Sequence, residues 1–427
     1  MKSCASSADT YGVRSPAPTL ITRQPVYDAG GGVFGFALIG SPAADGPGAG
    51  DAARSTDSAR TLVQGVLSGA LDGLTRGHKV IVEVSADLLL EGLDGLIRGG
   101  EAVIKLPPGT SDSRELASLL DRLRATGTMV VLSRYRHRDD RRDLLPHVDA
   151  VSIDLSAPEL SPHPGEVRLP LLGENIDDLE RFHRARDLGC SWYEGAAFIG
   201  SAVIERSGPV GFRPVHLAVL KAVQRPDVDY AELERLVKQD IQLTHAFLRY
   251  VNSAYFGWRG RLESLRHAFV LLGEHAVRSW ATLVVMADLA ADQPQQLAVT
   301  AALRARFCEL LGRESRVAAQ PLELFTLGMF SLIDVLSGRS MREVLAELPL
   351  SPDVQNALLG EENPLRLVLD AVIAYEEADW PALAVAVERL GADDERLLEL
   401  YLAAVDWAAG TFDRALDVSA GQELPVY

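Results

Sequence analysis

Short apolar runs alternate with amphipathic stretches through the first half of the chain, and this alternation restricts the possible folds more than any other feature. Between the apolar runs, residues 61–74, 88–97, 114–123 and 177–188 place apolar side chains three and four positions apart, as helices that pack on a sheet do. Strands that alternate with helices favour a parallel α/β sheet, and eight strands predict a TIM-like (β/α) barrel. The expected strands are residues 21–26, 33–39, 80–85, 102–106, 128–132, 150–155, 167–172 and 192–198.

Glycine-rich segments indicate how the first strands are connected. Asp28 and Ala29 precede Gly30, Gly31 and Gly32, and glycine accepts the positive φ angles of tight turns. Residues 21–26 and 33–39 are therefore expected to form an antiparallel hairpin. Residues 41–57 contain Pro and Gly without apolar periodicity, which predicts a flexible loop.

The chain changes character near Ser207, Gly208 and Pro209. After Pro214 the apolar residues keep helical spacing, which predicts an all-α bundle. We therefore expect a disordered lead-in at residues 1–19, a barrel domain at residues 20–205 and a helical domain at residues 206–427. The lead-in does not resemble a signal peptide, because no long apolar stretch follows Lys2.

Charge and cysteine content argue against several classes of protein. The chain has 42 Lys and Arg residues and 59 Asp and Glu residues, and its net charge of −17 disfavours nucleic acid as a partner. No apolar segment reaches the length of a membrane span, so no membrane partner is expected. Cys4, Cys190 and Cys308 form neither a disulfide framework nor a zinc-ligand pattern, which is typical of a cytoplasmic protein.

Two family resemblances follow one another along the chain. Residues 21–28, 35–39, 173–176 and 194–198 resemble the opening and closing segments of EAL domains, the barrels that hydrolyse cyclic di-GMP. Residues 239–243, 248–255, 264–268 and 271–273 are similar to HDOD domains, which are degenerate relatives of HD phosphohydrolases. Residues 329–334 resemble the later helix of EAL-HDOD tandem signalling proteins. The HDOD-type motif positions are Asp240, Asn252, Ser253 and Gly273.

The EAL resemblance implies a pair of divalent metals held by oxygen ligands at the strand ends, and most of these ligands are replaced. Ala37, Glu83 and Lys105 stand at a glutamate, an asparagine and a glutamate of the family pattern. Ser133 and Arg134 fall on its Asp-Asp pair, Ser152 on its lysine and Glu194 on its glutamine. Only Asp154 and Glu174 match, and each could instead cap a helix or pair with Lys105 or Arg134.

The HD resemblance is equally incomplete, because the chain contains no His-Asp dipeptide and the pair falls on Phe330 and Ser331. From these replacements we expect no metal, no cofactor and no catalytic residue, and we expect that the chain is not an enzyme. Asn252 and Ser253 either end a helix or contact a partner.

The resemblance implies a cytoplasmic bacterial signalling protein that acts through an unidentified protein partner and forms a homodimer. An aromatic cluster could supply the partner contact or fill the bundle core: Tyr250, Tyr255, Phe256 and Trp258. Two alternatives remain open. In the first, Lys105 and Arg134 attract cyclic di-GMP without hydrolysis, although four neighbouring carboxylates oppose an anion. In the second, the chain is a metal-dependent cyclic di-GMP phosphodiesterase.

Overall fold

The computed structural model describes residues 20–41, 72–75, 77–91, 100–157, 167–195, 212–225, 227–252, 262, 264–289 and 295–415. The predicted lead-in at residues 1–19, most of the predicted loop at residues 41–57 and the predicted domain boundary at residue 205 lie outside these ranges.

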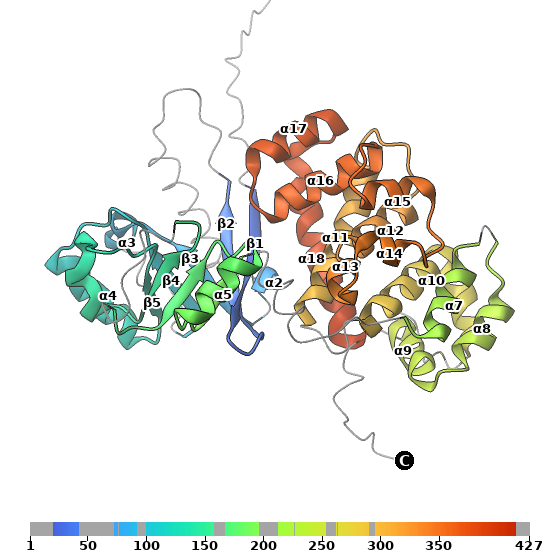
Figure 1. Ribbon diagram of the computed structural model, residues 1–427, viewed down its shortest axis with the longest axis horizontal. Coiled ribbons are helices and arrows are strands. Elements are labelled where there is room, and N and C mark those ends of the chain that lie inside the picture. Colours follow the sequence, from blue (N-terminus) through green and yellow to red (C-terminus); the bar gives the residue numbers. More distant parts are fainter. Residues whose placement is uncertain are drawn as a thin grey trace, which may run out of the picture.

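The N-terminal part is a closed barrel whose strands follow the order of the sequence (Figure 1). Strand β1 is antiparallel to both β2 and β8, and the other neighbouring pairs are parallel. The predicted hairpin is therefore confirmed. The strands are β1 (Ile21–Asp28), β2 (Val33–Gly40), β3 (Lys79–Glu83), β4 (Ala102–Leu106), β5 (Met129–Leu132), β6 (Ala150–Asp154), β7 (Leu171–Glu174) and β8 (Trp192–Glu194).

The turn between β1 and β2 is held by the side chain of Asp28. Its Oδ1 atom accepts hydrogen bonds from the N–H groups of Gly30 and Gly32, at 2.8 and 2.9 Å. Gly31 has φ 86°, a conformation that glycine adopts without strain. This local geometry explains why the glycine run could be recognised in the sequence.

One predicted strand is displaced. Residues 167–172 were expected to form the seventh strand, but β7 begins at Leu171. Pro170 has no N–H group to donate to a ladder, although its carbonyl oxygen accepts from Val151 at 3.1 Å. The apolar residues before Pro170 therefore pack against the core without extending the strand.

Inward-facing residues of the barrel form one compact apolar layer. Because side chains alternate along a strand, the residues two positions further on form the next layer, at the end where the parallel strands finish. The apolar layer consists of Val26, Ala37, Ile81, Val103, Val131, Ala150 and Leu172. Described helices on the outside of the barrel are α2 (Asp72–Thr75), α3 (Ala86–Leu90), α4 (Arg114–Ala125) and α5 (Leu179–Asp187), with the 3-10 segment η2 (Asp140–His147).

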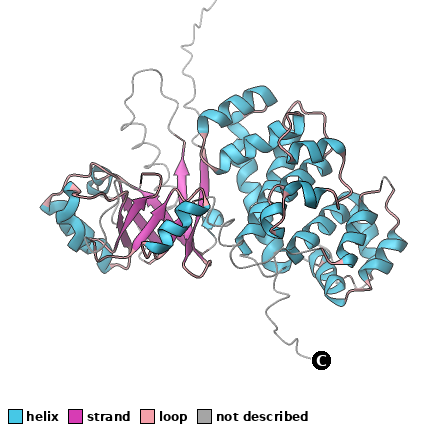
Figure 2. Ribbon diagram, in the orientation of Figure 1, coloured by secondary structure: helices cyan, strands magenta, loops and turns pink. Residues whose placement is uncertain are grey.

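In the C-terminal part, all the regular elements among the described residues are helices (Figure 2). A barrel followed by a helical bundle is the fold class that the sequence predicted. Phe247 packs on Phe269 and Trp280 in the core, with ring centroids 4.5 and 4.6 Å apart. The helices are α7 (Pro214–Val223), α8 (Tyr230–Val237), α9 (Ile241–Val251), α10 (Leu265–Leu289), α11 (Gln295–Arg313), α12 (Pro321–Phe330), α13 (Ile333–Ser337), α14 (Met341–Leu345), α15 (Pro352–Leu358), α16 (Pro364–Glu376), α17 (Trp380–Leu390) and α18 (Leu397–Ala415), with the 3-10 turn η4 (Asp394–Arg396).

Strand β1 joins the two halves, and it stands beside the helical part in Figure 1. It pairs with β8 only over Val26–Asp28, so the preceding edge of β1 is open to other partners. Tyr375 Oη donates to the Ile21 carbonyl oxygen at 3.0 Å, and the Arg23 N–H donates to Tyr401 Oη at 3.3 Å. Two tyrosines, one from α16 and one from α18, thus supply hydrogen-bond partners to backbone groups in the part of β1 that does not pair with β8. We call this contact the β1 seam.

Side chains extend the seam on both sides. The Arg23 guanidinium lies 4.5 Å from the centre of the Phe36 ring and donates to the Leu74 carbonyl oxygen. Gln24 Nε2 donates to the backbone oxygen of Glu376 at 3.3 Å.

Among the described helices, none combines the length and the apolar content that a bilayer crossing demands.

Candidate functional site

The barrel mouth gathers most of the polar positions that the sequence singled out. Each of these side chains follows an inward-facing residue by two positions, so they share one layer at the ends of β3 to β8. Carboxylates and a lysine therefore occupy the centre of the barrel above an apolar floor. The layer contains Glu83, Lys105, Ser133, Ser152, Glu174 and Glu194.

A buried ion-pair cluster dominates this layer. Lys105 Nζ lies 2.5 Å from Glu174 Oε1 and 3.0 Å from Glu194 Oε2. Burial alone lowers the pKa of Lys105, but the charges of Glu174 and Glu194 outweigh it and raise that pKa, so the ammonium stays charged. Burial and the charge of Glu174 raise the pKa of Glu194, although Lys105 opposes them. One buried cation therefore bridges two glutamates.

A second ion pair lies at the more exposed rim. Arg134 Nη2 lies 3.0 and 3.2 Å from the two carboxylate oxygens of Glu83. The backbone of Arg134 has φ 49°, which is uncommon for a residue other than glycine. The backbone N–H of Arg134 donates to Ser152 Oγ at 2.7 Å. Ser133 and Ser152 are fully buried. The two serines therefore line the wall of the barrel, and Ser152 fixes the turn that carries Arg134.

Asp154 belongs to a separate hydrogen-bond group. Its Oδ1 atom accepts from the Ser156 N–H, the Ser156 hydroxyl and Asn175 Nδ2, at 2.9, 2.6 and 2.9 Å. Burial raises the pKa of Asp154, but these hydrogen bonds outweigh burial and hold that pKa below its usual value. Asp154 is therefore ionised and is held by the residues that follow β6 and β7.

The donor set at this mouth does not fit the pair of divalent cations that the EAL pattern implies. Ala37 carries no ligand atom and belongs to the apolar layer below. Glu174 and Glu194 are both within 3.0 Å of an ammonium group, and Glu83 is paired with a guanidinium. Over the described ranges, no group of three His, Cys, Asp or Glu side chains is arranged to hold a metal.

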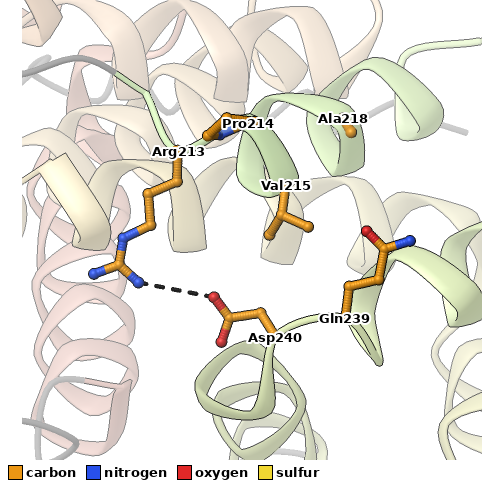
Figure 3. A pocket seen from close by; sticks show the side chains of 6 residues that line it. All are labelled: Arg213, Pro214, Val215, Ala218, Gln239 and Asp240. Carbon is orange, nitrogen blue, oxygen red and sulfur yellow. Dashed lines mark ion pairs between the residues drawn. The ribbon is translucent and has the colours of Figure 1, made fainter.

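The HDOD-type position Asp240 lies at the start of α9, beside a cavity of about 440 Å³ (Figure 3). Its Oδ1 atom accepts from the Leu243 N–H at 3.1 Å, which is the geometry of a helix N-cap. Its Oδ2 atom lies 3.6 Å from His216 Nε2 and 3.7 Å from Arg213 Nη1. Asp240 therefore ties the start of α9 to α7 and to the segment that enters the helical part.

Asn252 closes the other end of α9. Its Nδ2 atom donates to the carbonyl oxygens of Leu248 and Leu262, at 2.7 and 2.9 Å, and its Oδ1 atom accepts from the Leu262 N–H at 2.7 Å. Gly273 has φ 76° and ψ 168° and divides α10 into two helical parts. Both motif residues thus shape the backbone.

Of the four aromatic residues that were predicted to contact a partner or fill the core, the structure describes Tyr250. Tyr250 is half-buried and packs against the bundle core. Ser253, Tyr255, Phe256 and Trp258 lie outside the described residues. At the positions of the HD pair, Phe330 is fully buried and the Ser331 hydroxyl donates to the Gly328 carbonyl oxygen at 2.8 Å.

The sequence did not reveal the β1 seam. Tyr375 lies 354 residues after the Ile21 carbonyl that it binds, and Tyr401 lies 378 residues after Arg23. Tyrosines in apolar helical stripes are read as core residues, and here they are core residues whose hydroxyl groups also bind a strand. No local pattern distinguishes the two cases.

Residues 212–342, within the helical part, match the family model of the HDOD domain. The C-terminal region therefore contains an HDOD domain, as predicted. A Vibrio cholerae protein named cyclic di-GMP phosphodiesterase CdgJ is 27% identical over 400 residues, which are 91% of this chain and 92% of that protein. The uncharacterized protein YuxH of Bacillus subtilis is 23% identical over 92% of this chain and 98% of its own.

Solved structures similar to this chain include EAL proteins. Klebsiella pneumoniae BlrP1, in a complex with calcium and cyclic di-GMP, is 15% identical and has a TM-score of 0.35. The match covers 42% of this chain and 54% of that chain. An EAL domain protein from Listeria monocytogenes is 15% identical with a TM-score of 0.33, and the match covers 42% of this chain and 87% of that one.

One expectation from the sequence is wrong. We expected from the replaced ligands that the chain is not an enzyme, but the Vibrio cholerae relative, which matches 91% of the chain, is named as one. The expectation was based on how many oxygen ligands of one metal-site pattern are replaced in this chain. The number of replaced ligands does not determine whether the protein catalyses a reaction.

Proposed function

We propose that this chain is a signal-transduction protein of cyclic di-GMP pathways. In this proposal the barrel mouth is the site for the dinucleotide, and the helical part transmits the state of the barrel to a protein partner. The name of the Vibrio cholerae relative supports the choice of cyclic di-GMP. The HDOD domain at residues 212–342 supports a second functional part beside the barrel.

The observation that carries this proposal is the position of strand β1 between the mouth and the helical part. Val26 of β1 pairs with Glu194 of β8, and Glu194 is bound by Lys105. Three residues earlier on the same strand, the Arg23 N–H donates to Tyr401 of α18. A rearrangement of the Lys105 cluster therefore reaches the helical part through one short, hydrogen-bonded strand.

The mouth offers two cations to the phosphates of a dinucleotide, Lys105 and Arg134, and both are already paired with glutamates. Binding therefore requires an exchange of ion pairs, in which a phosphate replaces a carboxylate as the partner of the cation. Because Arg134 and Glu83 are partly exposed, dissolved salt screens their contribution. We expect binding that weakens as ionic strength rises.

Hydrolysis of cyclic di-GMP is the second candidate function, and the named phosphodiesterase among the relatives favours it. Calorimetry with cyclic di-GMP, in EDTA and in MnCl₂, measures binding, and chromatography of the same samples measures the linear product. Binding accompanied by slower amide hydrogen exchange in α16 and α18 supports the proposal. If no heat and no product are detected under either condition, the proposal is wrong.

A protein partner and a homodimer are also part of the proposal. Affinity purification of the intact chain from its host, followed by mass spectrometry, identifies the partner. Light scattering of the purified protein measures its mass against the 46.1 kDa of one chain. A monomeric mass at micromolar concentration contradicts the homodimer.

A further inference from the structure

The Lys105 ammonium group lies between two buried carboxylates at the mouth of the barrel. It lies 2.5 Å from Glu174 Oε1 and 3.0 Å from Glu194 Oε2, so two carboxylate oxygens from neighbouring strands converge on one point. Hard divalent cations bind carboxylate oxygens at about 2.0 to 2.6 Å, a range that includes the Lys105 contact to Glu174 but not the longer one to Glu194. The geometry is that of a cation site whose cation belongs to the chain.

The surroundings require a cation at this point. The side chains of Glu174 and Glu194 are only 9% and 13% exposed, and Lys105 is 8% exposed. Two buried carboxylates that face each other repel, and without a counterion at least one of them must bind a proton. Glu83 adds a further negative charge near Glu194.

We infer that Lys105 is a built-in counterion that fills a latent divalent-cation site between Glu174 and Glu194. Removal of the ammonium charge opens this site to a free divalent ion, which completes its coordination with water. The inference rests on the ion-pair geometry and is independent of whether the barrel binds cyclic di-GMP.

The test compares the intact protein with two variants that each lose one lysine charge. Lys105→Met removes the counterion and keeps a side chain of similar length. Lys79→Met is the matched control, because Lys79 Nζ donates to the Gly100 carbonyl oxygen at 2.8 Å and lies 5.9 Å from the centre of the Phe34 ring, outside the cluster. Electron paramagnetic resonance measures free Mn²⁺ in each sample, and calorimetry measures the melting temperature in EDTA and in millimolar MnCl₂.

The expected result is selective. Lys105→Met binds one Mn²⁺ ion at least roughly tenfold more tightly than the intact protein, and MnCl₂ raises its melting temperature by about 4 °C. The intact protein and Lys79→Met show neither effect. Glu194→Gln in the Lys105→Met background removes one ligand and abolishes the gain in Mn²⁺ affinity, which assigns the ion to this site.

Two outcomes overturn the inference. The first is Mn²⁺ binding by the intact protein as tight as that of Lys105→Met, since the lysine would then fill no site. The second is the absence of any gain in Lys105→Met. If that variant fails to fold in EDTA, Lys105→Gln replaces it, because its neutral amide can still donate to the glutamates; no gain in Lys105→Gln is equally decisive.

Discussion

The Tyr375 hydroxyl donates a hydrogen bond of 3.0 Å to the carbonyl oxygen of Ile21, and both groups are buried. Burial raises the pKa of Tyr375 well above its usual value, so the hydroxyl keeps the proton that it donates at neutral pH. The Tyr375 and Tyr401 rings lie 4.6 Å apart and hold each other against β1. The β1 seam is thus one packed unit.

Tyr375→Phe tests the energy of this seam. The substitution leaves a buried carbonyl without its donor and should lower the free energy of unfolding by about 1 to 3 kcal/mol. Urea denaturation of the full chain measures this loss. Tyr230→Phe is the control, because the Tyr230 ring stacks on Phe269 within the helical part, away from β1. Equal losses in both variants would contradict the role assigned to the hydroxyl.

Asp154→Asn tests the electrostatics of the barrel mouth. The folded protein holds the pKa of Asp154 below its unfolded value of about 3.9, so its ionisation stabilises the fold above that pH and the benefit disappears as pH falls through the folded pKa. The difference in unfolding free energy between the intact protein and Asp154→Asn should therefore shrink from pH 7 towards about pH 2. A difference that is independent of pH would contradict the lowered pKa.

Gly328→Ala tests the close approach of α12 to α11. A methyl group at Gly328 would overlap the Arg304 carbonyl oxygen, so the helices must separate. We expect a loss of about 1 to 3 kcal/mol despite the better helix propensity of alanine. Gly410→Ala in α18 meets no atom within 4 Å, and it should be neutral or slightly stabilising. Thermal unfolding of the two variants distinguishes these effects.

Asn252→Ala separates the two interpretations of that motif residue. If Asn252 mainly joins the end of α9 to Leu262, its removal leaves backbone groups unpaired and costs about 1 to 3 kcal/mol. Asn252→Asp keeps the acceptor for the Leu262 N–H and should cost less. A partner-contact residue would instead lose partner binding in a pull-down with an unchanged melting temperature.

The barrel could be predicted from the sequence because its strands and its first turn leave local patterns. Short apolar runs and the glycines after Asp28 place β1 and β2 within a few residues of their observed bounds. Pro170 also left a local signal, but the apolar residues before it outweighed that signal in the prediction of β7.

The sequence allowed us to predict which residues lie at the barrel mouth, but not which of them form ion pairs with one another. Residues at the ends of parallel strands share one end of a barrel, so Lys105, Glu174 and Glu194 could be placed together. Which glutamate binds which cation depends on side-chain geometry that no spacing encodes. For the same reason the pairing of Glu83 with Arg134 could not be predicted.

The open edge of β1 has a practical consequence for anyone who divides this protein. A fragment that stops after β8 would keep the barrel strands but strip Tyr375 and Tyr401 from the edge, leaving an unsatisfied N–H and C=O in solvent-facing β-structure. Exposed strand edges with unpaired backbone groups favour pairing with a second molecule, and such a fragment should precipitate or oligomerise during purification. Strand β1 therefore depends on the helical part for hydrogen-bond partners as well as on the other strands of the barrel.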